Sequence, residues 1–565
     1  MSELDGGGFS VQKTVIGVDF GTESGRAVVV DVRSGAILAA HVTPYPHGVL
    51  DEVLPTGEQL GDNWALQHPE DYLTVLKTSI PKVLQISKVS PETVIGIGID
   101  FTSCTMLPVN AEGAPLCLLP MFEHRPHSWP KLWKHHSAAE EAQDVTQLAA
   151  ARQESFLPLY GGAISTEWMI PKILQVLRSD PKVYEASNRF VEAGDWVTAQ
   201  LTGNFVRNRS AAGFKAMWTE TGPPDSEFFA ELDPRLQHIM CTKLRGKVVP
   251  VGSVAGHLVE SLAQATGLCP GIPVAAAAVD AFAAVPGAGV AQPGTMVLAM
   301  GTSTCHMVLS EELHMVEGIT GVVKDGILPS FYGYEAGQAA VGDIFNWFLE
   351  NMVPDSYIEH ARANKMSVFD LLETKASDLT PGESGLVALD WWNGNRSILG
   401  DAHLSGMMVG LTLSTKTEEM YRALIEATAF GTRKIVERFV ESGVEINKLV
   451  ACGGLPGKNK MLMQIYADVT GRKISTPAVD ESTALGAAIL AAASAGLKLG
   501  GYDSVTEAIH QMSPHRVVEF HPIQKNVERY NELYEVYCVL HDTFGQGSPE
   551  LMHRLRKLRE LTRKS

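Results

Sequence analysis

Two stretches of the sequence, far apart in the chain, share one pattern, and this duplication constrains the fold more than any other feature. They are Thr14–Asp31, TVIGVDFGTESGRAVVVD, and Met296–Leu309, MVLAMGTSTCHMVL. In each, an apolar strand runs into a Gly-Thr turn and a second apolar strand follows, which predicts a β-hairpin. A motif repeated inside one chain indicates two similar structural units. We therefore expect two domains of related fold.

The turn of the first hairpin carries side chains that suit a magnesium–phosphate site. Its two glycines let the backbone turn tightly and approach a ligand. Thr22 and Ser24 add hydroxyl groups, and Arg26 adds a positive fork that fits phosphate oxygens. Asp19, at the end of the first strand, is a hard oxygen ligand of the kind that Mg²⁺ takes. Taken by itself, this stretch is equally consistent with an ordinary hairpin that has a polar turn.

The second copy favours the phosphate interpretation. Gly301 and Thr302 match the Gly-Thr of the first turn, but Ala299 stands where the first copy has Asp19. A duplicated hairpin with a single acid offers one metal ligand and two sets of phosphate donors. This arrangement suits a nucleotide held between two similar domains.

Size and composition narrow the class of protein. At 565 residues the chain exceeds one usual core. The hydrophobic fraction of 45% and the charged fraction of 19% are ordinary for a soluble globular protein. The net charge of −18 argues against a nucleic acid or an anionic membrane as partner. No run approaches the roughly 18–20 apolar residues of a membrane span.

Cysteine usage and the first residues indicate a cytoplasmic protein. The seven cysteines form no CxxC pair and are expected to be reduced. The start, MSELDGGGFSVQ, has no apolar signal-peptide core. We interpret it as a flexible leader and exclude it from the fold argument.

Strands and helices alternate in both halves, which predicts an α/β fold. We expect an N-terminal domain over residues 14–290 and a C-terminal domain over residues 294–550. Helical patterns cover residues 69–86, 138–153, 166–178, 195–201, 418–442 and 483–497. Further strands are expected over residues 93–99, 274–279 and 448–452, and a loop over residues 41–64.

Two acids are candidates for a catalytic base. Asp280 lies between a buried strand and a helix, where its carboxylate could accept the proton of a hydroxyl that attacks phosphorus. The same position suits a helix N-cap aspartate, and the sequence does not separate these readings. Asp100, at the end of the strand over residues 93–99, is the main rival for the base.

Other polar positions have both a functional and an ordinary interpretation. Gly453 and Gly454 follow a strand and could let a nucleotide lie against the backbone, although a tight turn needs the same residues. Lys215 and Glu335 could hydrogen-bond sugar hydroxyls, although each alone is more typical of a surface charge. Four histidines cluster without zinc-type spacing and predict no metal site: His124, His127, His135 and His136.

With these residues in place, the chain resembles the FGGY carbohydrate kinases of the sugar kinase, hexokinase and actin superfamily, from about Thr14 to about His541. The stretches that carry the resemblance are DFGTESGR, the Gly-Asp-Trp at 194–196, the Leu-Thr-Gly at 201–203, VDAFAA, GTSTCH, Gly342 with the Phe-Asn-Trp at 345–347, SGMMVGLTL, and the Gly-Gly at 453–454 with the Leu-Met-Gln at 462–464. Singly these motifs are weak, but their order along the chain is specific.

The resemblance implies two ribonuclease-H-like domains with ATP and sugar in a cleft between them. It implies Asp280 as the catalytic base and Asp19 as the holder of Mg²⁺. By similarity, Thr22, Ser24 and Arg26 surround the transferred phosphoryl. The nucleotide contacts would be Gly301, Thr302, Gly342, Gly453, Gly454 and Asn459, and the sugar contacts Thr102, Lys215, Asp280 and Glu335. Glycerol kinases place a glutamine where this chain has Ala281, which argues against glycerol.

The resemblance also implies a reaction, namely ATP-dependent phosphorylation of the terminal hydroxyl of a ketopentose. The stretches EAGQAAVGDIFNW and LDWWNGNRSILGDAHLSG favour L-ribulose, converted to L-ribulose 5-phosphate in arabinose catabolism. The sugar is expected mainly on the first domain and ATP mainly on the second. Kinases of xylulose or D-ribulose remain alternatives, as does an ATPase switch like actin or the heat-shock ATPases. The oligomeric state stays open, with a homodimer as the default expectation.

Overall fold

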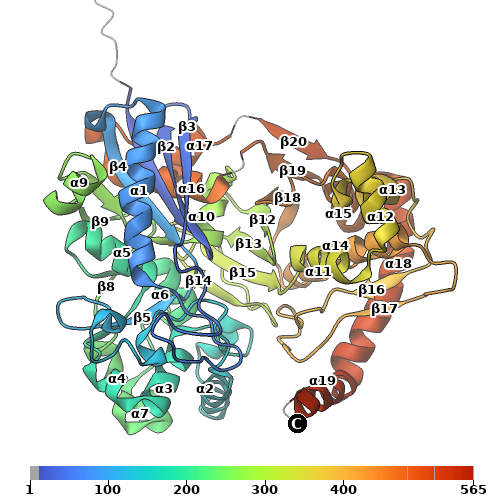
Figure 1. Cartoon of the computed structure of the whole chain (residues 1–565), viewed down its shortest axis with the longest axis horizontal. Coiled ribbons are helices and arrows are strands. Elements are labelled where there is room, and N and C mark those ends of the chain that lie inside the picture. Colours follow the sequence, from blue (N-terminus) through green and yellow to red (C-terminus); the bar gives the residue numbers. More distant parts are fainter. Residues whose placement is uncertain (1–11, 480, 515, 564–565) are drawn as a thin grey trace, which may run out of the picture.

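Two seven-stranded sheets organise the molecule in the computed structural model, which describes residues 12–479, 481–514 and 516–563. Figure 1 shows the first sheet among the blue strands and the second among the green-to-orange strands beside it. The expected leader lies, except for Gln12, outside the described residues.

The first sheet has the strand order β3-β2-β1-β4-β10-β9, and β11 pairs with β4 at one end. Strands β1 and β2 form the predicted antiparallel hairpin, with Asp19 opposite Arg26. Strand β4 runs parallel to β1 and places Asp100 beside Asp19. The bounds are β1 Thr14–Phe20, β2 Ser24–Asp31, β3 Ile37–Pro44, β4 Val94–Phe101, β9 Val254–His257, β10 Pro273–Ala275 and β11 Ala278–Val279.

The second sheet repeats this plan, with the order β14-β15-β13-β12-β18-β19-β20. Strand β12 pairs antiparallel with β13 and parallel with β18, as β1 does with β2 and β4. The predicted duplication of the hairpin is therefore confirmed. The bounds are β12 Gly294–Met300, β13 Thr304–Ser310, β14 Gly321–Lys324, β15 Tyr332–Gln338, β18 Ile446–Cys452, β19 Ile474–Pro477 and β20 Val517–Phe520.

Helices cover the sheets, and the expected helices are present with ends shifted by a few residues. Those of the first half are α1 Pro69–Ser87, α2 Ala139–Ala151, α3 Met169–Ser179, α4 Pro181–Ala186, α5 Ala193–Thr202, α6 Arg209–Ala216, α7 Ser226–Leu232, α8 Ile239–Thr242, α9 Glu260–Thr266 and α10 Asp280–Gly287. Those of the second half are α11 Gly342–Met352, α12 Asp355–Ala363, α13 Val368–Ser377, α14 Thr417–Glu441, α15 Lys460–Thr470, α16 Ser482–Leu499, α17 Val505–Met512, α18 Gln524–Asp542 and α19 Glu550–Arg563.

Six short strands form three further two-stranded sheets. These are β5 Met106–Val109 with β6 Arg189–Glu192, β7 Val206–Asn208 with β8 Lys247–Val249, and β16 Val387–Leu389 with β17 Met407–Val409. The strands β16 and β17 are joined by a long loop over residues 390–406.

Two local expectations differ from the structure. The start of the expected loop, His41–Pro44, belongs to strand β3, since its backbone pairs with β2. The single strand expected over residues 274–279 is two strands, which pair with β4 at Ile97 and at Asp100.

Helix α16 packs against the first sheet, although in the chain it lies between β19 and β20 of the second sheet. In Figure 1 it lies, coloured orange, among the blue strands. A Cβ atom at Gly17 of β1 or Gly98 of β4 would come within 2.0 and 1.9 Å of the carbonyl oxygens of Ala484 and Ala487. Glycines on the strands and alanines on the helix therefore allow this close contact. The division at residues 290–294 remains a prediction.

By length and composition, α16 is also long and apolar enough to cross a membrane, the one such helix among the described residues. The expectation that no stretch approaches this limit was therefore wrong. About 67% of that stretch is buried inside the molecule, against β1, β4 and α10. Its apolar character is that of a core helix.

The same helix positions α10, which begins at Asp280. A Cβ atom at Gly486 of α16 would lie 1.8 Å from the carbonyl oxygen of Ala283, and one at Gly287 of α10 would lie 1.8 Å from that of Ser482. The two helices thus meet backbone to backbone. This contact ties the start of α10 to the segment between β19 and β20 of the second sheet.

Candidate active site

The predicted metal ligand Asp19 lies at the end of β1 and is almost fully buried. Its Oδ2 accepts a hydrogen bond of 2.8 Å from Thr483 Oγ1 of α16 and lies 3.1 Å from Arg26 Nε. Arg26 in turn pairs through Nη1 with Glu481. The charged end of the first hairpin is therefore held by the segment that begins α16. Arg26 has carboxylate partners, which a phosphate would have to share.

The first turn keeps its two predicted hydroxyl residues, Thr22 and Ser24, partly exposed. The turn is closed by a hydrogen bond of 2.9 Å from the Gly21 N–H to the Ser24 carbonyl oxygen. It is supported from behind by Trp133, whose Nε1 donates to Thr22 Oγ1 at 3.1 Å, and by Gln67, whose Nε2 donates to the Thr22 carbonyl at 2.8 Å. The backbone of this turn is therefore preorganised.

Asp280 opens α10 and is partly exposed, with its Oδ1 accepting the Ala281 N–H at 2.7 Å. Burial of the carboxyl group raises the pKa of Asp280 to about 7, and the negative charge of Asp19 adds to this shift. The N-cap position itself belongs to Val279. A partly exposed carboxylate that exchanges its proton near neutral pH is well suited to general-base work.

The rival base, Asp100, has a different environment. It is fully buried, and neither carboxyl oxygen has a hydrogen-bond partner among the described residues. Burial first, and then the neighbouring Asp19, raise the pKa of Asp100 well above its usual value. A carboxyl group with no exposed surface is poorly placed to take a proton from a substrate, so the geometry favours the partly exposed Asp280.

The predicted sugar contacts Lys215 and Glu335 are not surface charges. Lys215 of α6 and Glu335 of β15 are both buried, and Lys215 Nζ lies 2.5 Å from Glu335 Oε2. Burial alone would lower the pKa of Lys215, but the Glu335 carboxylate outweighs burial and raises it. The pair joins the first half of the chain to the second.

Thr102, the third predicted sugar contact, is buried just after β4. Its backbone N–H donates to the Phe20 carbonyl oxygen at 3.0 Å, and its Oγ1 lies 3.0 Å from Thr105 Oγ1. This hydrogen bond to β1 places the turn after β4 beside the end of the first hairpin.

Three of the predicted nucleotide segments come together at the second turn. The Gly342 N–H donates to the Gly301 carbonyl oxygen at 3.1 Å, and the Val341 N–H donates to that of Thr302 at 2.8 Å. A Cβ atom at Gly453, whose φ is +97°, would lie 2.5 Å from the Met300 carbonyl oxygen. Glycine is therefore required for this contact between segments that are far apart in the sequence.

Gly454 and Asn459 follow Gly453 in the connection from β18 to α15. Gly301, Thr302, Gly453 and Gly454 are all exposed, as contacts with a ligand require. The Asn459 side chain caps α15 by accepting the Leu462 N–H at 2.7 Å, and its Nδ2 lies 3.5 Å from the Tyr421 hydroxyl. Capping alone explains this asparagine, so its nucleotide contact remains a prediction.

A second link between the halves was missed in the sequence. Arg396, in the loop over residues 390–406, places its Nη2 3.0 Å from Glu167 Oε1. The same carboxylate oxygen lies 3.1 Å from His136 Nε2. Burial would raise the pKa of Glu167, but Arg396 and His136 lower it below its usual value. Arg396 lies in the stretch LDWWNGNRSILGDAHLSG, and nothing local predicts its partner.

The donor set at the end of β1 fits a divalent cation. The carboxyl groups of Asp19, Asp100 and Asp280 interact electrostatically, and Arg26 is the nearby cation that pairs with Asp19. Carboxylate oxygens are the ligands that Mg²⁺ prefers. Asp19 is the member of this set that directly contacts an arginine.

Within the described ranges, one group of three has ligand atoms all within 4.8 Å of one another, namely His47, His68 and Asp71, and the three acids near the end of β1 do not meet this limit. His47 Nδ1 already lies 2.7 Å from Asp71 Oδ1. The two imidazole rings stack, with centroids 4.0 Å apart and planes 12° from parallel. Ring nitrogens ligate in the plane of the ring, so stacked rings do not converge on one ion. The His124–His136 region contains no such cluster among those residues.

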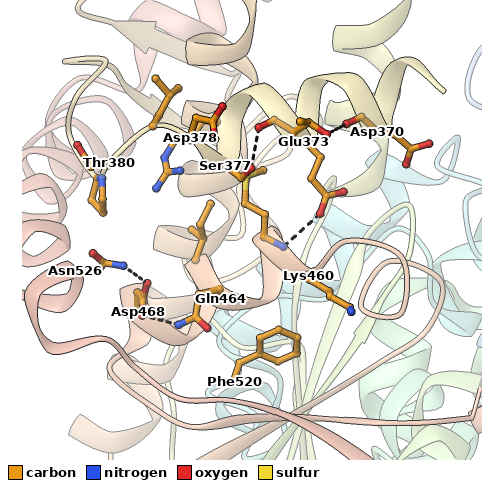
Figure 2. Close-up of a pocket in the computed structure, with 16 residues that line it drawn as sticks. Asp370, Glu373, Ser377, Asp378, Thr380, Lys460, Gln464, Asp468, Phe520 and Asn526 are labelled. Atoms are coloured by element: carbon orange, nitrogen blue, oxygen red, sulfur yellow. Dashed lines mark hydrogen bonds between the residues drawn. The ribbon is translucent and has the colours of Figure 1, made fainter. Parts of the chain in front are cut away.

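A separate pocket lies among the helices of the second half. It has a volume of about 800 Å³ and is lined by residues of α13, α14, α15, β20 and α18. Figure 2 shows that its polar side chains contact one another: Asp468 accepts from Gln464 and Asn526 at 2.9 and 2.8 Å. None of the predicted site residues lines this pocket.

Comparison with known proteins agrees with this geometry. Models of the FGGY family of carbohydrate kinases match residues 14–287 with the N-terminal domain and residues 296–495 with the C-terminal domain. The chain is 56% identical to a ribulokinase of Anoxybacillus flavithermus over 98% of both chains. It is 55% identical to a ribulokinase of Halalkalibacterium halodurans over 97% of this chain and 98% of the relative.

Solved structures show the same fold at low identity. A xylulose kinase of Rhodospirillum rubrum is 23% identical, with a TM-score of 0.76 over 96% of this chain and 100% of that one. A glycerol kinase of Plasmodium falciparum with ADP is 17% identical, with a TM-score of 0.73 over 93% and 98%. The predicted two-domain fold of the actin and hexokinase type is thereby confirmed. The chain belongs to the FGGY family of carbohydrate kinases and is an ATP-dependent sugar kinase.

Proposed function

We propose that this protein is a ribulokinase, which transfers the γ-phosphoryl group of ATP to the terminal hydroxyl of L-ribulose and forms L-ribulose 5-phosphate, as in arabinose catabolism. Similarity to ribulokinases over nearly the whole chain supports the substrate. The observation that carries the proposal is structural. The buried Lys215–Glu335 pair lies within electrostatic reach of the candidate base Asp280.

In the proposed mechanism, Lys215 and Glu335 hold the sugar by its hydroxyl groups. The ammonium group donates to sugar oxygens, and the carboxylate accepts from sugar hydroxyls. Because one residue comes from each half, sugar binding requires both halves in place. This requirement aligns the sugar with a phosphoryl group held at the two turns, which is a positioning effect.

Asp280 then accepts the proton of the terminal hydroxyl as its oxygen bonds to the γ-phosphorus and the bond to the leaving phosphate oxygen breaks. The backbone N–H groups of the two turns, with Thr22, Ser24 and Thr302, stabilise charge on the phosphoryl oxygens. A bound Mg²⁺, held by Asp19, would neutralise phosphate charge. Contact between the halves excludes water, which would otherwise accept the phosphoryl group.

Several finer features belong to the same proposal. The nucleotide would lie mainly on the second half, against Gly301, Gly342, Gly453 and Gly454, with Asn459 at the start of α15. The expected Mg²⁺, the cytoplasmic location, the homodimer and the absence of a nucleic-acid partner also remain proposals.

A substrate panel tests the proposal. ADP release is measured with L-ribulose, D-ribulose, L-xylulose, D-xylulose and glycerol, and without sugar. We expect the largest kcat/KM for L-ribulose and negligible turnover without sugar. A larger kcat/KM for a xylulose or for D-ribulose would assign the chain to another kinase of the family. Sugar-independent turnover at the same rate would favour an ATPase switch.

A further inference from the structure

Arg396 belongs to a loop that is held against strand β15. The Gly337 N–H of β15 donates to Ser397 Oγ at 3.1 Å. Further along, Asn395 and Asp401 exchange backbone hydrogen bonds of 2.9 Å, and Asn395 Oδ1 accepts the Leu399 N–H at 3.0 Å. The backbone around Arg396 is therefore fixed relative to β15.

The side chain of Arg396 lies on the face of β15 that carries Glu335. Side chains two residues apart on a strand share a face, so position 337 points the same way as Glu335. A Cβ atom at Gly337 would lie 3.2 Å from Arg396 Cδ and 3.6 Å from Nη1. The absence of a side chain at Gly337 thus leaves room for the arginine beside Glu335.

Arg396 and Lys215 belong to two parallel links between the halves. Lys215 of the first half pairs with Glu335 of the second, and Arg396 of the second half pairs with Glu167 of the first. Glu167 also affects the pKa of Lys215, and Glu335 that of Arg396, so the two pairs are electrostatic neighbours. Glu335 and Lys215 also act on the carboxyl group of Asp280, so both links lie in its electrostatic neighbourhood.

Most of the donors on Arg396 remain available. Only the Nη2 contact with Glu167 is made to a side chain or carbonyl of the described residues, and the side chain is about 22% exposed. A guanidinium group carries five N–H donors in a fixed fork. Unused donors beside a sugar-binding pair offer hydrogen bonds to further oxygens of the same ligand.

We propose that Arg396 binds the C1 hydroxyl of the ketose, the end of the sugar remote from the transferred phosphoryl, and so selects ketoses that carry an oxygen there. This inference rests on the proposed function. With the C5 oxygen at Asp280 and the middle of the chain at the Lys215–Glu335 pair, the C1 end extends toward Arg396. Glu167 and His136 hold the guanidinium group in this orientation.

The test is a double-change cycle, in which one change removes the arginine side chain and the other removes the C1 hydroxyl of the sugar. kcat/KM is measured for wild type and Arg396→Ala with L-ribulose and with 1-deoxy-L-ribulose. A charge-assisted hydrogen bond accounts for roughly a ten- to hundredfold effect. We expect wild type to lose about that factor on the deoxy sugar. We expect Arg396→Ala to lose it on L-ribulose, with less than about threefold further loss on the deoxy sugar.

If the losses in kcat/KM from the two single changes multiply when both changes are made, the proposal is overturned. Such a result would show that Arg396 and the C1 hydroxyl act independently. A wild type that uses both sugars equally well would also overturn the proposal. KM for ATP should stay within about twofold of wild type, since the arginine is not placed at the nucleotide. Arg396→Lys keeps the charge without the fork, and it provides the same comparison if the alanine variant fails to fold.

Arg209→Ala is the matched control. Arg209 is another arginine that joins the halves, through a hydrogen bond of 3.0 Å from Nε to the Lys324 carbonyl oxygen. Its hydrogen-bond acceptors are backbone carbonyls rather than a carboxylate. We expect lower thermal stability and an unchanged ratio of kcat/KM between the two sugars. If wild type prefers another ketose of the panel, the proposed function fails, and the cycle is run with that ketose and its 1-deoxy analogue.

Discussion

The two sheets have the same plan but different residues at the same place. In the first, Asp19 of β1 lies beside Asp100 of β4. In the second, the equivalent neighbours on β12 and β18 are Ala299 and Cys452. The turn of the first hairpin is braced by side chains, whereas Gly301 and Thr302 of the second turn are exposed.

This difference teaches how one duplicated unit can serve two roles. Asp19, Asp100 and Asp280 all belong to the first half, where we propose that proton transfer takes place. The second half presents exposed glycines and backbone groups, against which a nucleotide can lie without a side chain in the way. If the roles are divided in this way, changes in the first half should affect the chemical step, and changes in the second half should affect nucleotide binding.

The largest effect is expected in the first half, at Asp280. Asp280→Asn removes the proton acceptor with little change in shape, so kcat should fall by about 10²–10⁴-fold. Nucleotide affinity, measured by titration calorimetry, should be retained. The control is Asp100→Asn, which should lose less than about tenfold, since Asp100 is buried behind Asp19. The opposite ranking of the two variants would identify Asp100 as the base.

The next effect comes from making the first hairpin resemble the second. Asp19→Ala copies the residue found at Ala299 and removes the proposed Mg²⁺ ligand. We expect a loss of about 10²–10³-fold in kcat, the usual cost of removing one electrostatic contact in an active site. The Mg²⁺ concentration for half-maximal rate should also rise. An unchanged Mg²⁺ dependence would mean that the metal is held elsewhere.

The pH dependence of the reaction should report the environment of Asp280. Because burial and Asp19 raise its pKa to about 7, the carboxylate form is lost as pH falls through that value. kcat/KM for the sugar should therefore fall about tenfold per unit below roughly pH 7 and level off above it. The residual activity of Asp280→Asn should not show this fall at low pH. A flat wild-type profile across this range would contradict the assignment.

The smallest effect is expected in the second half. Gly453→Ala places a Cβ atom 2.5 Å from the Met300 carbonyl oxygen at a φ of +97°. The backbone must shift, which should raise KM for ATP by roughly tenfold and lower stability by about 1–3 kcal/mol. KM for the sugar should change much less. A larger effect on the sugar than on ATP would show that the two halves do not separate these roles.

The local parts of the site could be predicted from the sequence. The two hairpins, Asp19 and Asp280 lie in short motifs whose strand, turn and helix signals are contained in neighbouring residues. Periodicity also located the long helices, since an amphipathic face repeats within the helix itself. These features depend on neighbouring residues alone.

Features that depend on tertiary contact could not be predicted. Lys215 and Glu335 are 120 residues apart, and each alone is typical of a surface charge. Arg396 and Glu167 are 229 residues apart. Helix α16 returns to the first sheet because glycines of β1 and β4 face its alanines, a match that no local window contains.

The most direct test of the account is a crystal structure with a non-hydrolysable ATP analogue, Mg²⁺ and L-ribulose bound together. The account predicts the triphosphate between the Thr22 and Thr302 turns, the metal at Asp19, and the C5 oxygen within about 3 Å of an Asp280 carboxylate oxygen. A sugar whose C5 oxygen contacts another base, or a triphosphate that contacts neither turn, would contradict it.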